Sequence, residues 1–172
     1  MGKETVFQNK YNELIDLINK FVISYLDNSA EIIATIDVAN EIGAEIALID
    51  RDILIPIYKF FNDLGMIKRA KLSVKLPSLY NEYEDSFEEL EDLFYEFSPS
   101  LYEENFVKKT NSFIAKKLLD IQEENVVAVV RDKHYEGIQY YLDNPDEIPT
   151  MDRLLDSKKT KKKGFFSRIF KI

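Results

Sequence analysis

Two charged clusters hold the residues of this chain that are best suited to chemistry. The first is residues 50–52, directly after the apolar run 46–49. The second is residues 131–134, which follow the apolar run 126–130 and include His134, the only histidine. Paired carboxylates suit acid/base chemistry or metal binding, and a histidine suits both roles near neutral pH. Any chemistry is therefore expected at these two clusters.

Each cluster also has a purely structural interpretation. Asp52 can cap a following helix, while Arg51 can pair with a neighbouring carboxylate. His134 can form a local hydrogen bond or meet solvent, and as a metal ligand it would need carboxylates such as Asp50, Asp52 or Asp132. The candidate catalytic residues are Asp50, Arg51, Asp52 and His134, and His134 is also the candidate ligand of a divalent metal.

Buried parallel strands are the elements expected to position the two clusters. Continuous apolar and β-branched runs are typical of strands covered on both faces, which predicts strands at 45–49 and 125–130. Functional groups collect just beyond the carboxyl ends of such strands. The two clusters should then lie together at one edge of a sheet.

Helical periodicity covers most of the remaining chain. It predicts two buried helix faces, one of Ile53, Ile57, Phe60, Phe61 and Leu64 and one of Phe87, Leu90, Leu93, Phe94 and Phe97. The expected helices span about residues 8–26, 29–42 with Gly43 as a left-handed cap, 52–64, 82–97, 101–122 and 135–143, and residues 68–80 are ambiguous. The predicted fold class is α/β, mostly helical by residue count, with a small parallel sheet, covering helices and a large helical insertion. Two strands are too few for a stable sheet, so strands are missed or the domain is incomplete.

Composition narrows the functional classes. The chain has no cysteine, which excludes disulfides, thiolate catalysis and Cys-ligated metal sites. Residues 1–156 carry 16 basic against 31 acidic side chains, a balance of −15, and ten of the acids fall within 82–104 with no base among them. This acidic run is interpreted as a solvated helix face. An acidic body repels phosphate backbones, so nucleic-acid binding is not expected.

The C-terminal residues 157–172 form a separate basic region after a domain that covers 1–156. They contain seven basic and no acidic side chains. In residues 164–172 the apolar side chains fall within one helical arc, the pattern of an amphipathic anchor on an anionic membrane. Disorder or binding to a protein groove are the alternatives. The predicted membrane-contact residues are Lys158, Lys159, Lys161, Lys162, Lys163, Phe165, Phe166, Arg168, Ile169, Phe170 and Lys171.

Several segments, in one order, resemble the TraB/PrgY (pheromone-shutdown) family of archaeal type. They are 31–53 with its "IDRDI", 97–101 with "FSPSL", 113–118 with "FIAKKL", 126–138 with "VVAVV" before a histidine and "GI", and 144–149 with "NPDEIP". The match covers about residues 30–156. The resemblance implies an α/β domain related to suspected metal-dependent peptidases, which use two Gly-x-x-His motifs.

The chain departs from the family pattern at both of these motifs, and at residues 109–111, where the family's acid and arginine are replaced. The family's first motif, usually "GTAHxS", has no counterpart, since this chain begins downstream of its expected place. The second motif survives as residues 131–134, with Arg131 in place of the glycine. The resemblance therefore indicates a shortened, degenerate member that has no cofactor or retains a divalent metal.

Three functional hypotheses follow from different classes. The first, which we favour, is a non-catalytic binding or regulatory module, peripheral on the cytoplasmic side of a membrane or cytoplasmic, with a peptide or protein partner and possible homo-oligomers. The second is a metal-dependent peptidase or hydrolase whose missing motif comes from a partner chain. The third is a fragment of a longer TraB-type membrane protein.

Overall fold

A computed structural model describes residues 30–82 and 87–155, together with the single residues 16 and 20. The predicted basic tail at 157–172 and most of the predicted helix at 8–26 lie outside the described residues.

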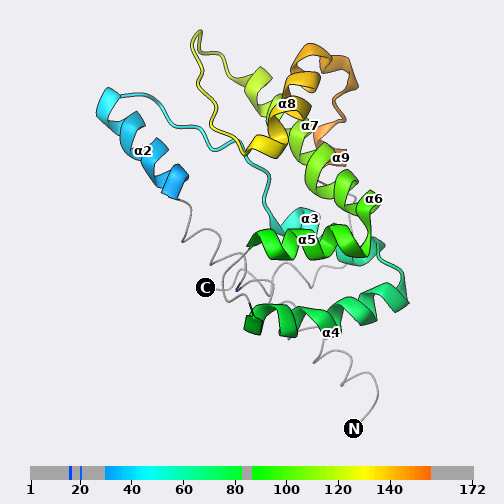
Figure 1. Ribbon diagram of the computed structural model, residues 1–172. Coiled ribbons are helices and arrows are strands. Elements are labelled where there is room, and N and C mark those ends of the chain that lie inside the picture. The colour runs from blue at the N-terminus through cyan, green and yellow to red at the C-terminus, as the bar shows by residue number, and fades with distance from the viewer. Residues whose placement is uncertain (1–15, 17–19, 21–29, 83–86, 156–172) are drawn as a thin grey trace, which may run out of the picture.

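The described part of the chain is helical and contains no β-strand (Figure 1). In chain order the elements are α2 (Ala30–Ile42), α3 (Leu54–Asp63), α4 (Met66–Glu82), α5 (Phe87–Phe97), α6 (Pro99–Tyr102), the π-helical turn η1 (Glu103–Lys108), α7 (Lys109–Asp120), α8 (Asp132–Asp143), the 3-10 turn η2 (Pro145–Glu147) and α9 (Met151–Leu154). The prediction of an α/β fold with a parallel sheet is therefore wrong for these residues.

The two predicted strands, 45–49 and 125–130, are non-helical connecting segments with no backbone ladder (Figure 1). Among the described residues, no backbone hydrogen bond joins one segment to the other. The apolar runs have strand-like composition, but a strand also needs a partner whose N–H and C=O groups complete its hydrogen bonds. The local sequence does not show whether such a partner strand is present.

The larger core lies where α3, α4, α5 and η1 meet. Phe60, Phe94 and Phe106 come from three of these elements, and their ring centroids are 4.9 to 5.9 Å apart. Such aromatic pairs bury large areas and gain further from their offset or edge contacts. The other fully or nearly fully buried apolar side chains in this core are Ile57, Phe61, Leu64, Leu72, Leu76, Leu90, Leu93 and Tyr102. Helical spacing correctly predicts the buried faces of α3 and α5.

A second, smaller core joins α7 to α8. Ile114, Ala115 and Ile138 are buried at its centre. Ile49 and Val130, the last apolar residues of the two connecting segments, pack against the same core. The segments therefore end at one place on the body of the protein, even though they do not form a sheet.

Helix α2 stands apart from these cores (Figure 1). None of its residues is buried. It ends as predicted, because Gly43 adopts a left-handed conformation with φ 69°. The Gly43 N–H donates to the carbonyl of Asn40 and the Ala44 N–H to that of Ala39, the paired bonds of a Schellman cap.

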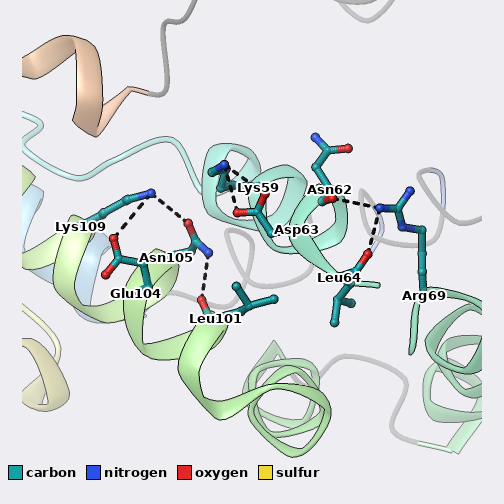
Figure 2. A network of polar contacts seen from close by, with 9 residues as sticks. All are labelled: Lys59, Asn62, Asp63, Leu64, Arg69, Leu101, Glu104, Asn105 and Lys109. Atoms are coloured by element: carbon teal, nitrogen blue, oxygen red, sulfur yellow. Dashed lines mark hydrogen bonds and ion pairs between the residues drawn. The ribbon is translucent and has the colours of Figure 1, made fainter. Parts of the chain in front are cut away.

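Polar side chains also close both ends of α3. The Asp52 carboxylate accepts a hydrogen bond from the Leu54 N–H at 2.9 Å, which confirms the capping interpretation of Asp52. At the other end, the Arg69 guanidinium donates to the carbonyls of Asn62 and Leu64 (Figure 2). These contacts fix where α3 starts and where the chain turns into α4.

Candidate functional site

Asp50 of the first charged cluster lies near the second cluster at the N-terminus of α8. Asp50 lies near enough to Arg131 and Lys133 for their charges to lower its pKa. Partial desolvation of the carboxylate outweighs these charges, so the pKa of Asp50 is raised overall. The predicted sheet edge is absent among the described residues, and of residues 50–52 only Asp50 lies near Arg131 and Lys133, whereas Arg51 donates to the Asn105 carbonyl and Asp52 accepts from the Leu54 N–H.

An ion cluster centred on Glu91 forms the charged half of the site. The Glu91 side chain on α5 is 9% exposed and lies 3.2 Å from the Arg131 guanidinium, while the Lys133 ammonium donates to the same carboxylate oxygen. Lys133 also donates to the Tyr102 hydroxyl at 3.3 Å. Burial lowers the pKa of Lys133, although the charge of Glu91 opposes this effect. Two cations thus share one buried acid.

His134 occupies the neutral half of the site and is bound to Asn111. Its Nδ1 lies 2.6 Å from Asn111 Oδ1, which makes Nδ1–H the donor and leaves Nε2 as the acceptor nitrogen. Burial, with the charges of Lys133 and Arg131, lowers the pKa of His134 to about 4. The imidazole is therefore neutral at physiological pH, with its tautomer set by the amide.

Gly137 makes room for this amide. It lies on α8 one turn after His134, and a Cβ at this position would come 1.9 Å from Asn111 Nδ2. The close approach of α7 and α8 at this point therefore depends on a residue without a side chain. The close packing of α7 against α8 thus explains why a glycine follows His134 by three residues.

Arg51 is buried against the π-helical turn. It is 4% exposed, and its Nη1 donates to the main-chain carbonyl of Asn105 at 3.0 Å. The Asn105 side chain is itself held, donating to the Leu101 carbonyl and accepting from the Lys109 ammonium (Figure 2). Turns of π-helix recur at functional sites, and this one provides the carbonyl that receives Arg51.

The predicted metal-ligand set does not assemble in the described part of the chain. Asp52 caps α3, and Asp50 lies beside basic residues. Among the described residues, no three His, Asp or Glu side chains form a group able to hold a metal ion. Among the described residues, His134 therefore has no set of carboxylate ligands around it.

Sequence reasoning missed Glu91, Asn105 and Asn111. Glu91 was included in the solvated acidic run, yet it lies three residues before the fully buried Phe94 on α5. Asn105 and Asn111 likewise fall on the apolar faces of η1 and α7. A polar residue at an apolar-face position was the available signal, because buried polar groups require partners.

Comparison with known proteins shows that the chain is similar to an archaeal protein. An uncharacterized protein of Methanocaldococcus jannaschii, MJ1365, is 31% identical over an alignment 149 residues long that covers 77% of this chain. The chain spans 37% of the length of that relative. No protein-family model matches the chain, and no solved structure matches it.

Proposed function

We propose that this chain is a TraB-like, non-catalytic binding module that associates with an anionic membrane surface. The observation that supports a non-catalytic role is the internal pairing of the site. Glu91 pairs with both Arg131 and Lys133, and His134 is hydrogen-bonded to Asn111, so the partners of these groups come from the protein itself. Groups arranged in this way stabilise an architecture, whereas a catalytic site directs such groups toward a substrate.

The membrane part of the proposal rests on the sequence of residues 158–171. No helix in the described part of the chain is long and apolar enough to cross a membrane. The proposed contact uses the basic and aromatic residues predicted for the tail, where each basic side chain contributes roughly 1 kcal/mol at an anionic surface.

Flotation with phosphatidylserine-containing vesicles tests the membrane part. The full chain should float with the vesicles, and Lys162→Glu with Lys163→Glu should weaken binding at least about tenfold. The matched control, Lys71→Glu with Lys108→Glu, changes the net charge equally at exposed positions of the body. Equal binding by both double variants, or no flotation of the full chain, would reject a tail-directed membrane contact.

A metal-dependent hydrolase is the second candidate, and the state of His134 favours it. The imidazole is neutral, and no hydrogen bond to its Nε2 is present among the described residues. That nitrogen could ligate a metal whose other ligands come from a partner chain.

Elemental analysis of the metal-reconstituted full chain separates the two candidates. The binding-module proposal predicts no equivalent of zinc, manganese or cobalt in either the parent protein or His134→Ala. One equivalent that is retained by the parent and lost in His134→Ala would instead establish a metal site and call for peptide-cleavage assays.

A further inference from the structure

Helix α4 has apolar side chains on two opposite sides. On one side, Leu72 and Leu76 are fully buried in the larger core. On the other side, Met66 is 84%, Ile67 75% and Val74 74% exposed. With about 3.6 residues per turn, the exposed apolar residues share this side and form an outer stripe opposite the core. The outer stripe consists of Met66, Ile67, Ala70, Val74 and Pro77.

The outer stripe has the spacing of a helix-packing surface. From residue 67 to residue 77 its members follow one another at intervals of three, four and three residues. This is the spacing at which one helix packs along another. Figure 1 shows α4 at the edge of the described body, beside α5. Single exposed apolar residues are ordinary, but a row of them along one side of a helix indicates a surface that binds a partner.

The charge of α4 is opposite to that of the body as a whole. Residues 66–81 contain four basic and no acidic side chains, whereas residues 1–156 have a balance of −15. Positive side chains therefore border the outer stripe of a protein that is otherwise acidic. A surface of this sign attracts a partner with negative charge.

Most of these cations have no acid beside them in the described part of the chain. Lys68 and Arg69 donate hydrogen bonds to main-chain carbonyls, which do not neutralise their charge. Lys71 is exposed and forms no ion pair with a described residue. Lys75 pairs with Glu96 at 2.9 Å, but both of these side chains are more than half exposed. The positive charge beside the stripe is therefore available to a partner.

Three other occupants fit these observations less well. A helix that lies on a membrane buries Trp, Phe or Leu side chains, and the outer stripe contains none of these. A second copy that docks through the same face would place the cations of the two copies against one another. An extended strand pairs through free backbone groups, which the interior of a helix does not offer. An acidic amphipathic helix, by contrast, matches both the apolar stripe and the cations.

We propose that the outer stripe of α4 binds an acidic amphipathic helix of a partner protein. The apolar side chains of that helix pack along Ile67, Ala70 and Val74, and its carboxylates lie beside Lys71 and Lys68. Such a contact covers the exposed apolar residues and supplies carboxylates to cations that lack them. This inference names the partner class of the proposed binding module and rests on that proposal.

Fluorescently labelled helical peptides test the proposal on the full chain. The acidic probe consists of three repeats of Leu-Ala-Glu-Ile-Gln-Ala-Glu, in which leucine and isoleucine recur at helical spacing. One control replaces every glutamate with lysine, and the other replaces the central isoleucine with proline to break the helix. Anisotropy titrations should show the acidic probe binding at least about tenfold tighter than either control. Equal affinity for the lysine control would overturn the charge argument, and equal affinity for the proline control would overturn helix docking.

Variants of the chain locate the binding surface. Val74→Glu should weaken binding of the acidic probe at least about tenfold, because it removes an apolar contact and adds a like charge. The matched control is Val127→Glu, the same change at a 92% exposed side chain of a connecting segment, where binding should be unchanged. Lys71→Glu should also weaken binding, with the exposed Lys108→Glu on η1 as its control. Thermal midpoints should equal that of the parent, since each altered side chain is exposed.

The outcomes separate this inference from the membrane proposal. Vesicle flotation of the full chain without binding of the acidic probe would reject the inference and leave the membrane proposal intact. Probe binding without flotation would support the inference and reject the membrane contact. Equal effects of Val74→Glu and Val127→Glu on probe binding would overturn the assignment to α4.

Two results would identify a different occupant of the stripe. A parent dimer that Val74→Glu converts to a monomer, as seen by light scattering, would identify a second copy. Vesicle flotation that Val74→Glu weakens and Val127→Glu does not would identify a membrane surface. Either result would overturn the inference.

Discussion

At the scale of single residues, the stability of the site depends on which charged side chains are buried next to one another. Glu91 is the acid that makes the meeting of Arg131 and Lys133 possible, because two cations without it would repel each other in a partly desolvated position. Removing one member of such a group leaves the others uncompensated.

Glu91→Gln should therefore lower the free energy of unfolding by about 1–3 kcal/mol, with partial exposure of the two cations limiting the loss. The matched control is Glu96→Gln on the same helix, which breaks the exposed pair with Lys75. That change should stay within about 0.5 kcal/mol. Urea denaturation of both variants measures the difference, and equal losses would contradict the central position given to Glu91.

The buried histidine predicts a pH dependence. The pKa of His134 is about 4 in the folded protein, below its ordinary 6.5, so the unfolded chain binds a proton at a higher pH than the folded chain does. The stability contributed by the neutral imidazole is complete above pH 6.5 and is lost as the pH falls toward 4. The loss should reach up to about 3 kcal/mol.

Urea denaturation between pH 7.5 and 4.5 checks this prediction, with His134→Gln as the reference. The reference retains all carboxylate titrations but has no imidazole. The parent should lose more stability than His134→Gln as the pH falls through this window. Parallel curves for the two proteins would show that His134 titrates normally when folded.

At the scale of elements, the contact between α7 and α8 depends on Gly137. Gly137→Ala should place a methyl group on the buried Asn111 amide and destabilise the protein by about 1–3 kcal/mol, despite the better helix propensity of alanine. Gly65→Ala is the control, because nothing lies within 4 Å of its added Cβ. Thermal or urea unfolding should find the control neutral or stabilised by up to about 1 kcal/mol.

Helix α2 offers the opposite case, an element with no buried residue. Since little tertiary packing holds it, it should open at much lower free energy than α7, whose first turns are buried. Hydrogen exchange should show α2 amides exchanging well before those of residues 110–115. Equal protection in both helices would mean that α2 is covered in solution.

At the scale of the whole molecule, the helical body buries its apolar side chains, whereas the projecting segments leave theirs exposed (Figure 1). Leu48→Lys with Val127→Lys should raise the concentration at which the protein remains unaggregated, because lysine blunts an unpaired edge. The thermal midpoint should be unchanged, since both side chains are exposed. Light scattering over a concentration series tests this, with Met66→Lys and Val74→Lys as the control at exposed apolar positions of the helix α4.

The sequence by itself determined the features that depend on near neighbours in the chain. Helical spacing predicted the buried faces of α3 and α5, and Gly43 and Asp52 act as caps as expected. Helices begin and end through contacts within a few residues, so a local pattern contains the necessary information.

Only the tertiary structure determined whether the apolar runs form strands and which residues make up the site. Residues 45–49 and 125–130 have the side chains of strands, but they lack a ladder because strand formation depends on hydrogen bonds to a distant segment. The partners of Arg131 and His134 likewise come from α5 and α7, 40 and 23 residues away. Such pairings arise from helix packing, and the spacing of residues along the chain does not specify them.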